Sequence, residues 1–178
     1  GAVDQAWTRA LELDGEGHAL PGFSLLFCSI ASMLSRGEAE RKTHLSFLES
    51  IADRSNLAGE IYAQVLCLDG EYEKAHTLYQ RAYDRSPHRF ERQRALIDSE
   101  LSLGHIKEAI SLARSLYILN PRSDLARLLL TDALITDMAL DEAEGLLLED
   151  EVDPRGHELK VRVDFMRGRY EQAAASAL

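Results

Sequence analysis

Apolar residues recur at helical spacing along most of the chain. Ile61, Tyr62, Val65 and Leu66 follow the i, i+3, i+4 pattern that places side chains on one face of a helix. A second segment with the same periodicity follows and stops before Pro87, because proline cannot continue a helix. The pattern therefore predicts successive helices separated by short turns.

The helical segments belong to an internal repeat. Gly70 and Gly104 are 34 residues apart, Met138 takes the same place after another 34, and Gly168 follows after 30. Five residues after each of these positions stands a small residue: Ala75, Ala109, Ala143 and Ala173. Glycine ends a helix readily, and alanine lets two helix backbones approach closely. Each repeat is therefore predicted to be one helix, a short turn and a second helix.

This pattern resembles the tetratricopeptide repeat (TPR), whose 34-residue motif places glycine at the turn between helix A and helix B. The repeat at 56–89 matches nearly throughout, with Gly70, Tyr72, Ala75, Ala82 and Pro87 at the motif positions. The resemblance implies an all-α fold, a right-handed superhelical solenoid of antiparallel helix pairs. The hand is an implication of the resemblance alone.

The repeats predict the organisation of the chain. Residues 56–89 and 90–123 form two repeats, 124–153 an irregular repeat that is about four residues short, and 154–178 a truncated repeat. Residues 23–55 are interpreted as a degenerate repeat with helices at 23–34 and 39–52, residues 15–22 as a loop, and 1–14 as the trailing helix of a truncated repeat. We expect all of them to form one solenoid domain, a fragment of a longer chain.

Composition narrows the function classes. The chain has 178 residues, of which 46% are hydrophobic, and a formal net charge of −10. Such a charge argues against non-specific binding to nucleic acid or to an anionic membrane. No apolar run approaches the ~18 residues of a membrane span, so we expect no insertion into a bilayer. Cys28 and Cys67 are the two cysteines, both interpreted as core residues of helices A.

The motifs of catalysis and metal binding are missing from the sequence. None of the six histidines stands three or four residues from another, which is the spacing of zinc ligands on a helix. The sequence also lacks the glycine-rich phosphate loop, the dinucleotide fingerprint and the nucleophile elbow. We therefore expect no enzymatic activity, no metal and no cofactor in this chain.

The TPR resemblance implies a ligand surface. In that family, the second, fifth, ninth and twelfth positions of helix A line a concave groove that holds a peptide or a partner helix. The corresponding candidates are Leu57, Glu60, Gln64, Glu91, Arg94, Asp98, Leu101, Leu128, Asp132 and Arg162, with Cys67, Leu125, Ile135, Glu158 and Phe165 at further equivalent positions. Acidic residues at two ninth positions, Asp98 and Asp132, argue against the clamp by which some members hold a terminal carboxylate.

A second candidate surface is a basic patch. Arg81, Arg85, Arg89 and Arg92 are close in sequence and would suit a partner carboxylate or phosphate. The alternative is that they cover exposed helix faces and pack their stems on neighbouring residues.

The sequence thus predicts a non-catalytic protein–protein interaction scaffold. Two alternatives stay open: the scaffold arm of a larger bacterial envelope export or secretion assembly, such as polysaccharide export, and a regulatory domain attached to an enzyme outside this chain. Partners are expected to be proteins or peptides, and self-association is expected through the truncated ends. The compartment, cytoplasmic or periplasmic, stays open.

Overall fold

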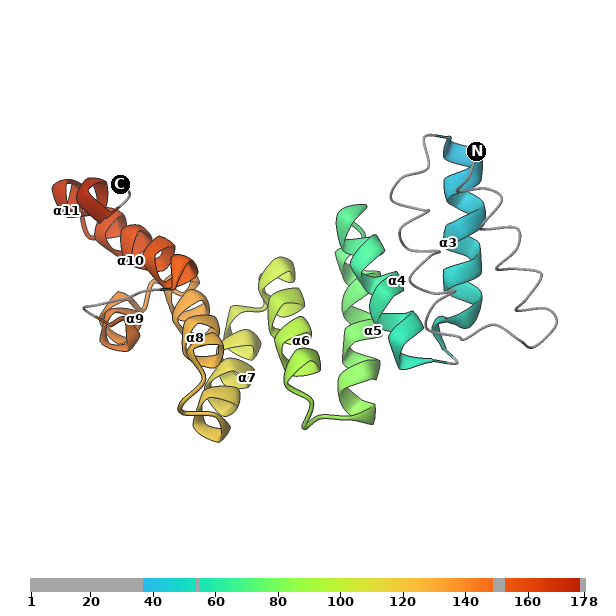
Figure 1. Cartoon of the computed structure of the whole chain (residues 1–178), viewed down its shortest axis with the longest axis horizontal. Helices are drawn as coiled ribbons and strands as arrows, with labels where there is room; N and C mark the ends of the chain where they lie inside the picture. Colours follow the sequence, from blue (N-terminus) through green and yellow to red (C-terminus); the bar gives the residue numbers. More distant parts are fainter. Residues whose placement is uncertain (1–36, 54, 149–152, 177–178) are drawn as a thin grey trace. The chain divides into compact units, whose positions relative to one another are not determined.

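The computed structural model describes residues 37–53, 55–148 and 153–176. In this part of the chain, all regular secondary structure is α-helical (Figure 1), which confirms the predicted all-α class. The helices are α3 (Glu38–Ala52), α4 (Asn56–Leu68), α5 (Tyr72–Arg85), α6 (Phe90–Leu103), α7 (Ile106–Leu119), α8 (Asp124–Thr136), α9 (Leu140–Leu146), α10 (Pro154–Met166) and α11 (Tyr170–Ser176).

The chain divides into two compact units. Unit 1 ends at Pro87 and unit 2 begins at His88. In unit 1, α4 packs against both α3 and α5. Its core includes Leu48, Ala58 and Val65, and Tyr62 packs beside them.

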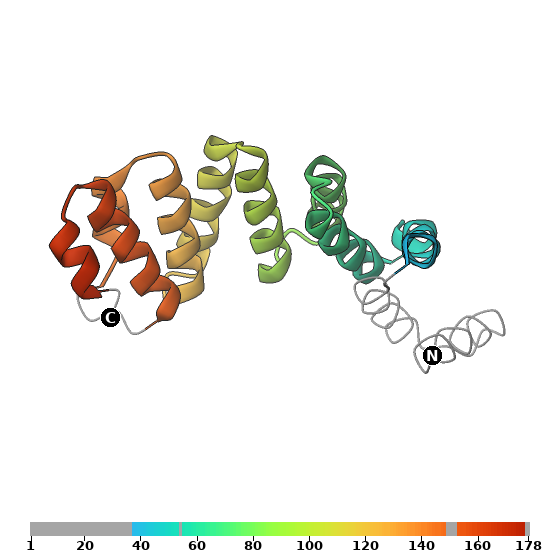
Figure 2. The same ribbon diagram turned by 90° about the horizontal axis from the view of Figure 1, so that it is seen from above.

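Unit 2 contains α6 to α11, and each of these helices packs against a neighbour in the sequence, as two views of the ribbon show (Figures 1 and 2). Helix α8 contacts α6, α7, α9 and α10, so most of its circumference is buried. Leu116, Leu129, Leu134 and Leu159 are fully or almost fully buried in this core. The first helices of the pairs are α6, α8 and α10. Each has some residues outside the apolar interior, and these residues can form a surface.

The turns within the helix pairs share one backbone geometry. A residue in the left-handed conformation ends the first helix at Gly70 (φ 79°), Gly104 (φ 78°), Met138 (φ 61°) and Gly168 (φ 74°). At Gly104, the N–H of His105 donates to the carbonyl of Glu100 at 2.9 Å. The same five-residue hydrogen bond, a feature of the Schellman motif, recurs at the other three turns. Met138 therefore adopts the glycine conformation without being glycine.

Helix α9 is unusually short. It has seven residues, whereas α5 and α7 have 14 each. The buried Arg127 donates from Nη1 to the carbonyl of Leu146 at 2.9 Å and from Nη2 to Asp124 at 3.2 Å. Leu147 then continues in an extended conformation. A buried side chain thus caps the end of α9, in the segment where the sequence predicts an irregular repeat.

Several predictions from the sequence fall on other parts of the chain. The trailing helix at 1–14, the loop at 15–22, the helix at 23–34 and Cys28 lie outside the described residues. The helix expected at 39–52 is α3. The repeat boundaries stay a prediction. Within the described residues, no helix combines the length and the apolar character that a membrane span needs.

Candidate functional site

Charged side chains from three helices meet on the outer face of the first helices of unit 2. We call this surface the A face and define it by Arg94 and Asp98 on α6, Asp132 on α8, and Arg155 and Arg162 on α10. Arg162 donates from Nη1 to Oδ1 of Asp132 at 2.7 Å, and Arg155 donates from Nη2 to Oδ2 at 3.2 Å. One carboxylate of α8 therefore holds two guanidinium groups of α10.

Asp98 extends this arrangement to α6. Its carboxylate lies 3.5 Å from Nε of Arg94. Burial is the main cause that raises the pKa of Asp98, the positive charges of Arg94 and Arg155 oppose that shift, and the negative charge of Asp132 adds to it. The charges of α6, α8 and α10 therefore act on one another across the A face.

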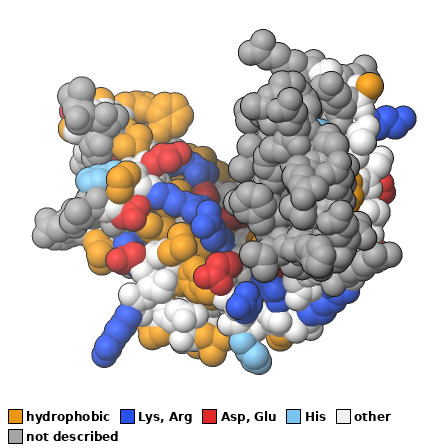
Figure 3. Space-filling model, turned by 45° about the vertical axis from the view of Figure 1, so that its right-hand side comes forward, with side chains coloured by type: hydrophobic (Ala, Val, Ile, Leu, Met, Phe, Trp, Pro, Cys, Tyr) orange, Lys and Arg blue, Asp and Glu red, His pale blue; other side chains and the backbone are white. Residues whose placement is uncertain are grey.

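Apolar side chains accompany these charges. Phe165 is 63% exposed on α10, one helical turn after Arg162. Its ring contacts that of Tyr170 edge-on, with centroids 5.4 Å apart. Leu101 is half-buried on α6. Figure 3 shows the side chains by type, with Lys and Arg in blue, Asp and Glu in red and hydrophobic residues in orange, and the three kinds intermingle on the visible surface. The A face thus offers guanidinium donors beside an exposed aromatic pair.

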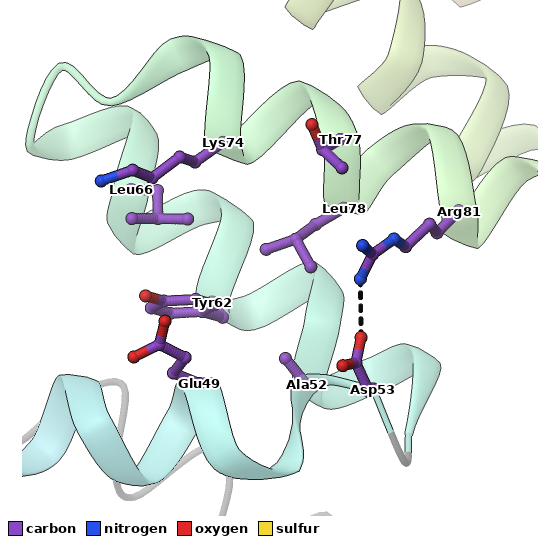
Figure 4. Close-up of a pocket in the computed structure, with 9 residues that line it drawn as sticks. All are labelled: Glu49, Ala52, Asp53, Tyr62, Leu66, Lys74, Thr77, Leu78 and Arg81. Atoms are coloured by element: carbon purple, nitrogen blue, oxygen red, sulfur yellow. Dashed lines mark hydrogen bonds and ion pairs between the residues drawn. The ribbon is translucent and has the colours of Figure 1, made fainter.

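A hollow lies in unit 1, between α3 and α5 with α4 beneath (Figure 4). We call it the α3–α5 slot. It has a volume of about 250 Å³ and is lined by Glu49, Ala52, Asp53, Tyr62, Leu66, Lys74, Thr77, Leu78 and Arg81. Arg81 donates from Nη1 to Oδ1 of Asp53 at 2.7 Å and so joins α5 to α3 at one end.

The slot combines an apolar base with charged edges. Burial raises the pKa of the Tyr62 phenol, and the negative charge of Glu49 raises it further, while Lys74 lowers it. The Lys74 ammonium lies 2.9 Å from the carboxylate of Glu71. The charges of Glu49 on α3 and Lys74 on α5 therefore both act on the Tyr62 phenol.

Comparison with solved structures identifies the fold. A tetratricopeptide repeat protein from Parabacteroides merdae superimposes with a TM-score of 0.71 at 18% identity, covering 99% of this chain and 78% of that protein. The chain has the TPR fold. The TPR protein YrrB, described as having an unusual peptide-binding site, gives a TM-score of 0.62 at 18% identity over 96% of this chain and 88% of YrrB. A MamA RS-1 double mutant gives a TM-score of 0.66 at 16% identity, covering 89% of this chain and 91% of the MamA chain. No protein-family model and no curated protein matches the sequence.

In the TPR fold, α6, α8 and α10 are the A helices of unit 2. The groove residues predicted on the A helices are not all at the surface. Leu128 and Ile135 are buried in the core of unit 2 because α8 is enclosed by its neighbours. Glu91 is exposed at the start of α6. The predicted positions of α4 belong to unit 1, where Leu57 and Gln64 are exposed and Glu60 is half-buried. Arg94, Asp98, Asp132 and Arg162 are the predicted residues that the structure brings together.

The predicted basic patch is not one exposed set. Arg81 and Arg85 project from α5, where Arg81 binds Asp53 and Arg85 donates to Oδ1 of Asn56 at 2.7 Å. Arg89 is exposed before α6, but Arg92 is buried. The interpretation that these arginines pack on their neighbours fits Arg81, Arg85 and Arg92.

Sequence reasoning missed Arg155 and the α3–α5 slot. Arg155 is the second residue of α10 and also the second position of the repeat predicted at 154–178, so the TPR pattern itself could have found it. The slot draws on three helices, and most of its edge comes from second helices, which the TPR resemblance does not assign to ligands.

The described residues offer little for other chemistry. No group of three or more His, Cys, Asp or Glu side chains in the described part of the chain is placed to hold a metal ion. Cys67 is half-buried, and burial raises the pKa of its thiol while a hydrogen bond with Tyr79 lowers it. A thiol with a raised pKa is a poor nucleophile, so Cys67 fits a structural role.

Proposed function

We propose that this chain is a protein-interaction scaffold that binds a peptide segment of another protein along the A face of unit 2. The observation that carries the proposal is the pair Arg155 and Arg162, held side by side on Asp132. The TPR fold of the chain supports it, as does the description of the TPR protein YrrB as peptide-binding.

The donor count explains how the A face can bind. Each guanidinium has five N–H groups, and the contact with Asp132 uses one from each arginine. The remaining donors can reach carbonyl or carboxylate oxygens of a peptide. Asp132 keeps the guanidinium groups oriented before binding, so less side-chain freedom is lost when the peptide arrives. Phe165, one turn further on, supplies apolar contact area.

A peptide-display selection tests the proposal. Random 12-residue peptides are selected on the whole chain, and the affinities of the enriched peptides are measured by fluorescence polarisation against variants of the A face. Arg162→Glu and Asp98→Arg each reverse one charge of the face, and we expect each to weaken binding about tenfold or more. Lys107→Glu reverses an exposed charge on α7 and serves as the matched control, for which we expect no change.

If neither Arg162→Glu nor Asp98→Arg weakens the binding of any enriched peptide, peptide binding lies away from the A face. Circular dichroism of each variant shows whether its helices are retained. The alternative roles as an envelope-assembly arm or as a regulatory domain stay predictions.

A further inference from the structure

We infer that the α3–α5 slot of unit 1 is a second docking site, which takes one large apolar side chain of a partner peptide, flanked in that peptide by a basic and an acidic residue. The inference is independent of the A face, because all residues of the slot lie in unit 1.

The shape of the slot suits an apolar anchor. Tyr62 and Leu66 of α4 and Leu78 of α5 form its base. A volume of about 250 Å³ corresponds to the liquid volume of about eight water molecules. Water in such a site finds few partners on the leucine side chains, so its replacement by an aromatic or branched side chain is favourable.

The edges of the slot carry opposite charges. Glu49 of α3 and Asp53, the residue that follows α3, lie on one edge, and Lys74 and Arg81 of α5 lie on the other. Asp53 and Arg81 neutralise each other at one end. Glu49 and Lys74 remain at the other end, and Figure 4 shows Tyr62 and Leu66 between them in that view.

Lys74 can exchange its present partner. The Lys74–Glu71 pair is exposed, with 69% and 50% of the two side chains accessible. Exposed ion pairs contribute little to stability, so a peptide carboxylate can replace Glu71 at little cost. The occupant that complements the slot therefore has an apolar residue over Tyr62 and Leu66, a basic residue toward Glu49 and an acidic residue toward Lys74.

The peptide-display selection described above also tests this site. Thr77 is exposed and lines the slot, so Thr77→Trp fills it and Thr77→Ser is the matched control. We expect a class of enriched peptides with one large apolar residue flanked by a basic and an acidic one. Their binding should weaken at least about tenfold on Thr77→Trp, Glu49→Lys and Lys74→Glu, and stay unchanged on Thr77→Ser and Arg162→Glu.

The peptides themselves provide a second measurement. Replacing the apolar residue of such a peptide by alanine should weaken binding about 30-fold, as expected for the residue that anchors the peptide. The inference is overturned if no enriched peptide is sensitive to Thr77→Trp, or if the sensitive peptides ignore both charge reversals. If all enriched peptides are weakened by Arg162→Glu and none by Thr77→Trp, the slot inference is wrong and the A-face proposal is supported. If all are weakened by Thr77→Trp and none by Arg162→Glu, the A-face proposal is wrong and the slot inference is supported.

Discussion

The left-handed conformation of Met138 predicts that glycine is more stable than alanine at this position. Met138 has φ 61° and is 61% exposed, so its side chain contributes little packing. A residue with a Cβ pays about 1–2 kcal/mol in this conformation. Glycine avoids that cost but loses about 0.5–1 kcal/mol more conformational freedom on folding. The difference leaves Met138→Gly about 0.5–1 kcal/mol more stable than Met138→Ala.

Two other positions serve as controls. Ser111 is exposed within the regular helix α7. In a helix, glycine is less stable than alanine by about 1 kcal/mol, so we expect Ser111→Gly to be less stable than Ser111→Ala, the opposite order to position 138. Gly104 has φ 78°, and a Cβ added there meets no atom within 4 Å. Gly104→Ala should therefore lose about 1 kcal/mol through backbone strain alone.

Thermal unfolding followed by far-UV circular dichroism measures the effect. For a chain of this size, the expected difference corresponds to a Tm about 1–4 °C higher for Met138→Gly than for Met138→Ala. The reasoning is refuted if alanine is as stable as glycine at position 138 while Ser111→Gly still melts below Ser111→Ala. That result would mean that the turn after α8 does not hold residue 138 in the left-handed region.

Two further predictions concern charged side chains of unit 2. Arg127→Met should lower the free energy of unfolding by about 1–3 kcal/mol in urea denaturation, because the Leu146 carbonyl loses its donor; an unchanged midpoint would contradict the capping role. The raised pKa of Asp98 means that its carboxylate is easier to protonate in the folded chain than in the unfolded chain, so its contribution to stability is present at low pH and is lost as the pH rises above about 4. The free energy of unfolding of Asp98→Asn minus that of the wild type should therefore increase from pH 3 to pH 7 in urea denaturation, and a decrease of this difference over the same range would contradict the shift.

The sequence predicts the helices well because their signals are local. Pro87 and Pro121 follow the ends of α5 and α7, and Gly70, Gly104 and Gly168 lie at the turns where they are expected. These residues act on the backbone within a few positions, so their effect does not depend on distant parts of the chain.

The candidate site is less predictable because exposure depends on neighbours. Leu128 stands at a ligand-facing position of the TPR pattern, yet it is buried, since α8 is surrounded by four other helices. Asp98 and Asp132 are acids that the sequence treats as obstacles to an anionic ligand. In the structure their charges are opposed by arginines, two of which come from α10 and stand 23 and 30 residues after Asp132.

The turns within the helix pairs are held by main-chain hydrogen bonds, so the side chains beside them need not pack against the core. Met138 in the turn after α8 and Leu68 at the end of α4 are both exposed. Evolution can rewrite such positions freely, provided that the left-handed residue stays compatible with its geometry. For the experimentalist, the same tips are natural attachment points for a fluorophore or an epitope, because a change there leaves the stacked interior intact.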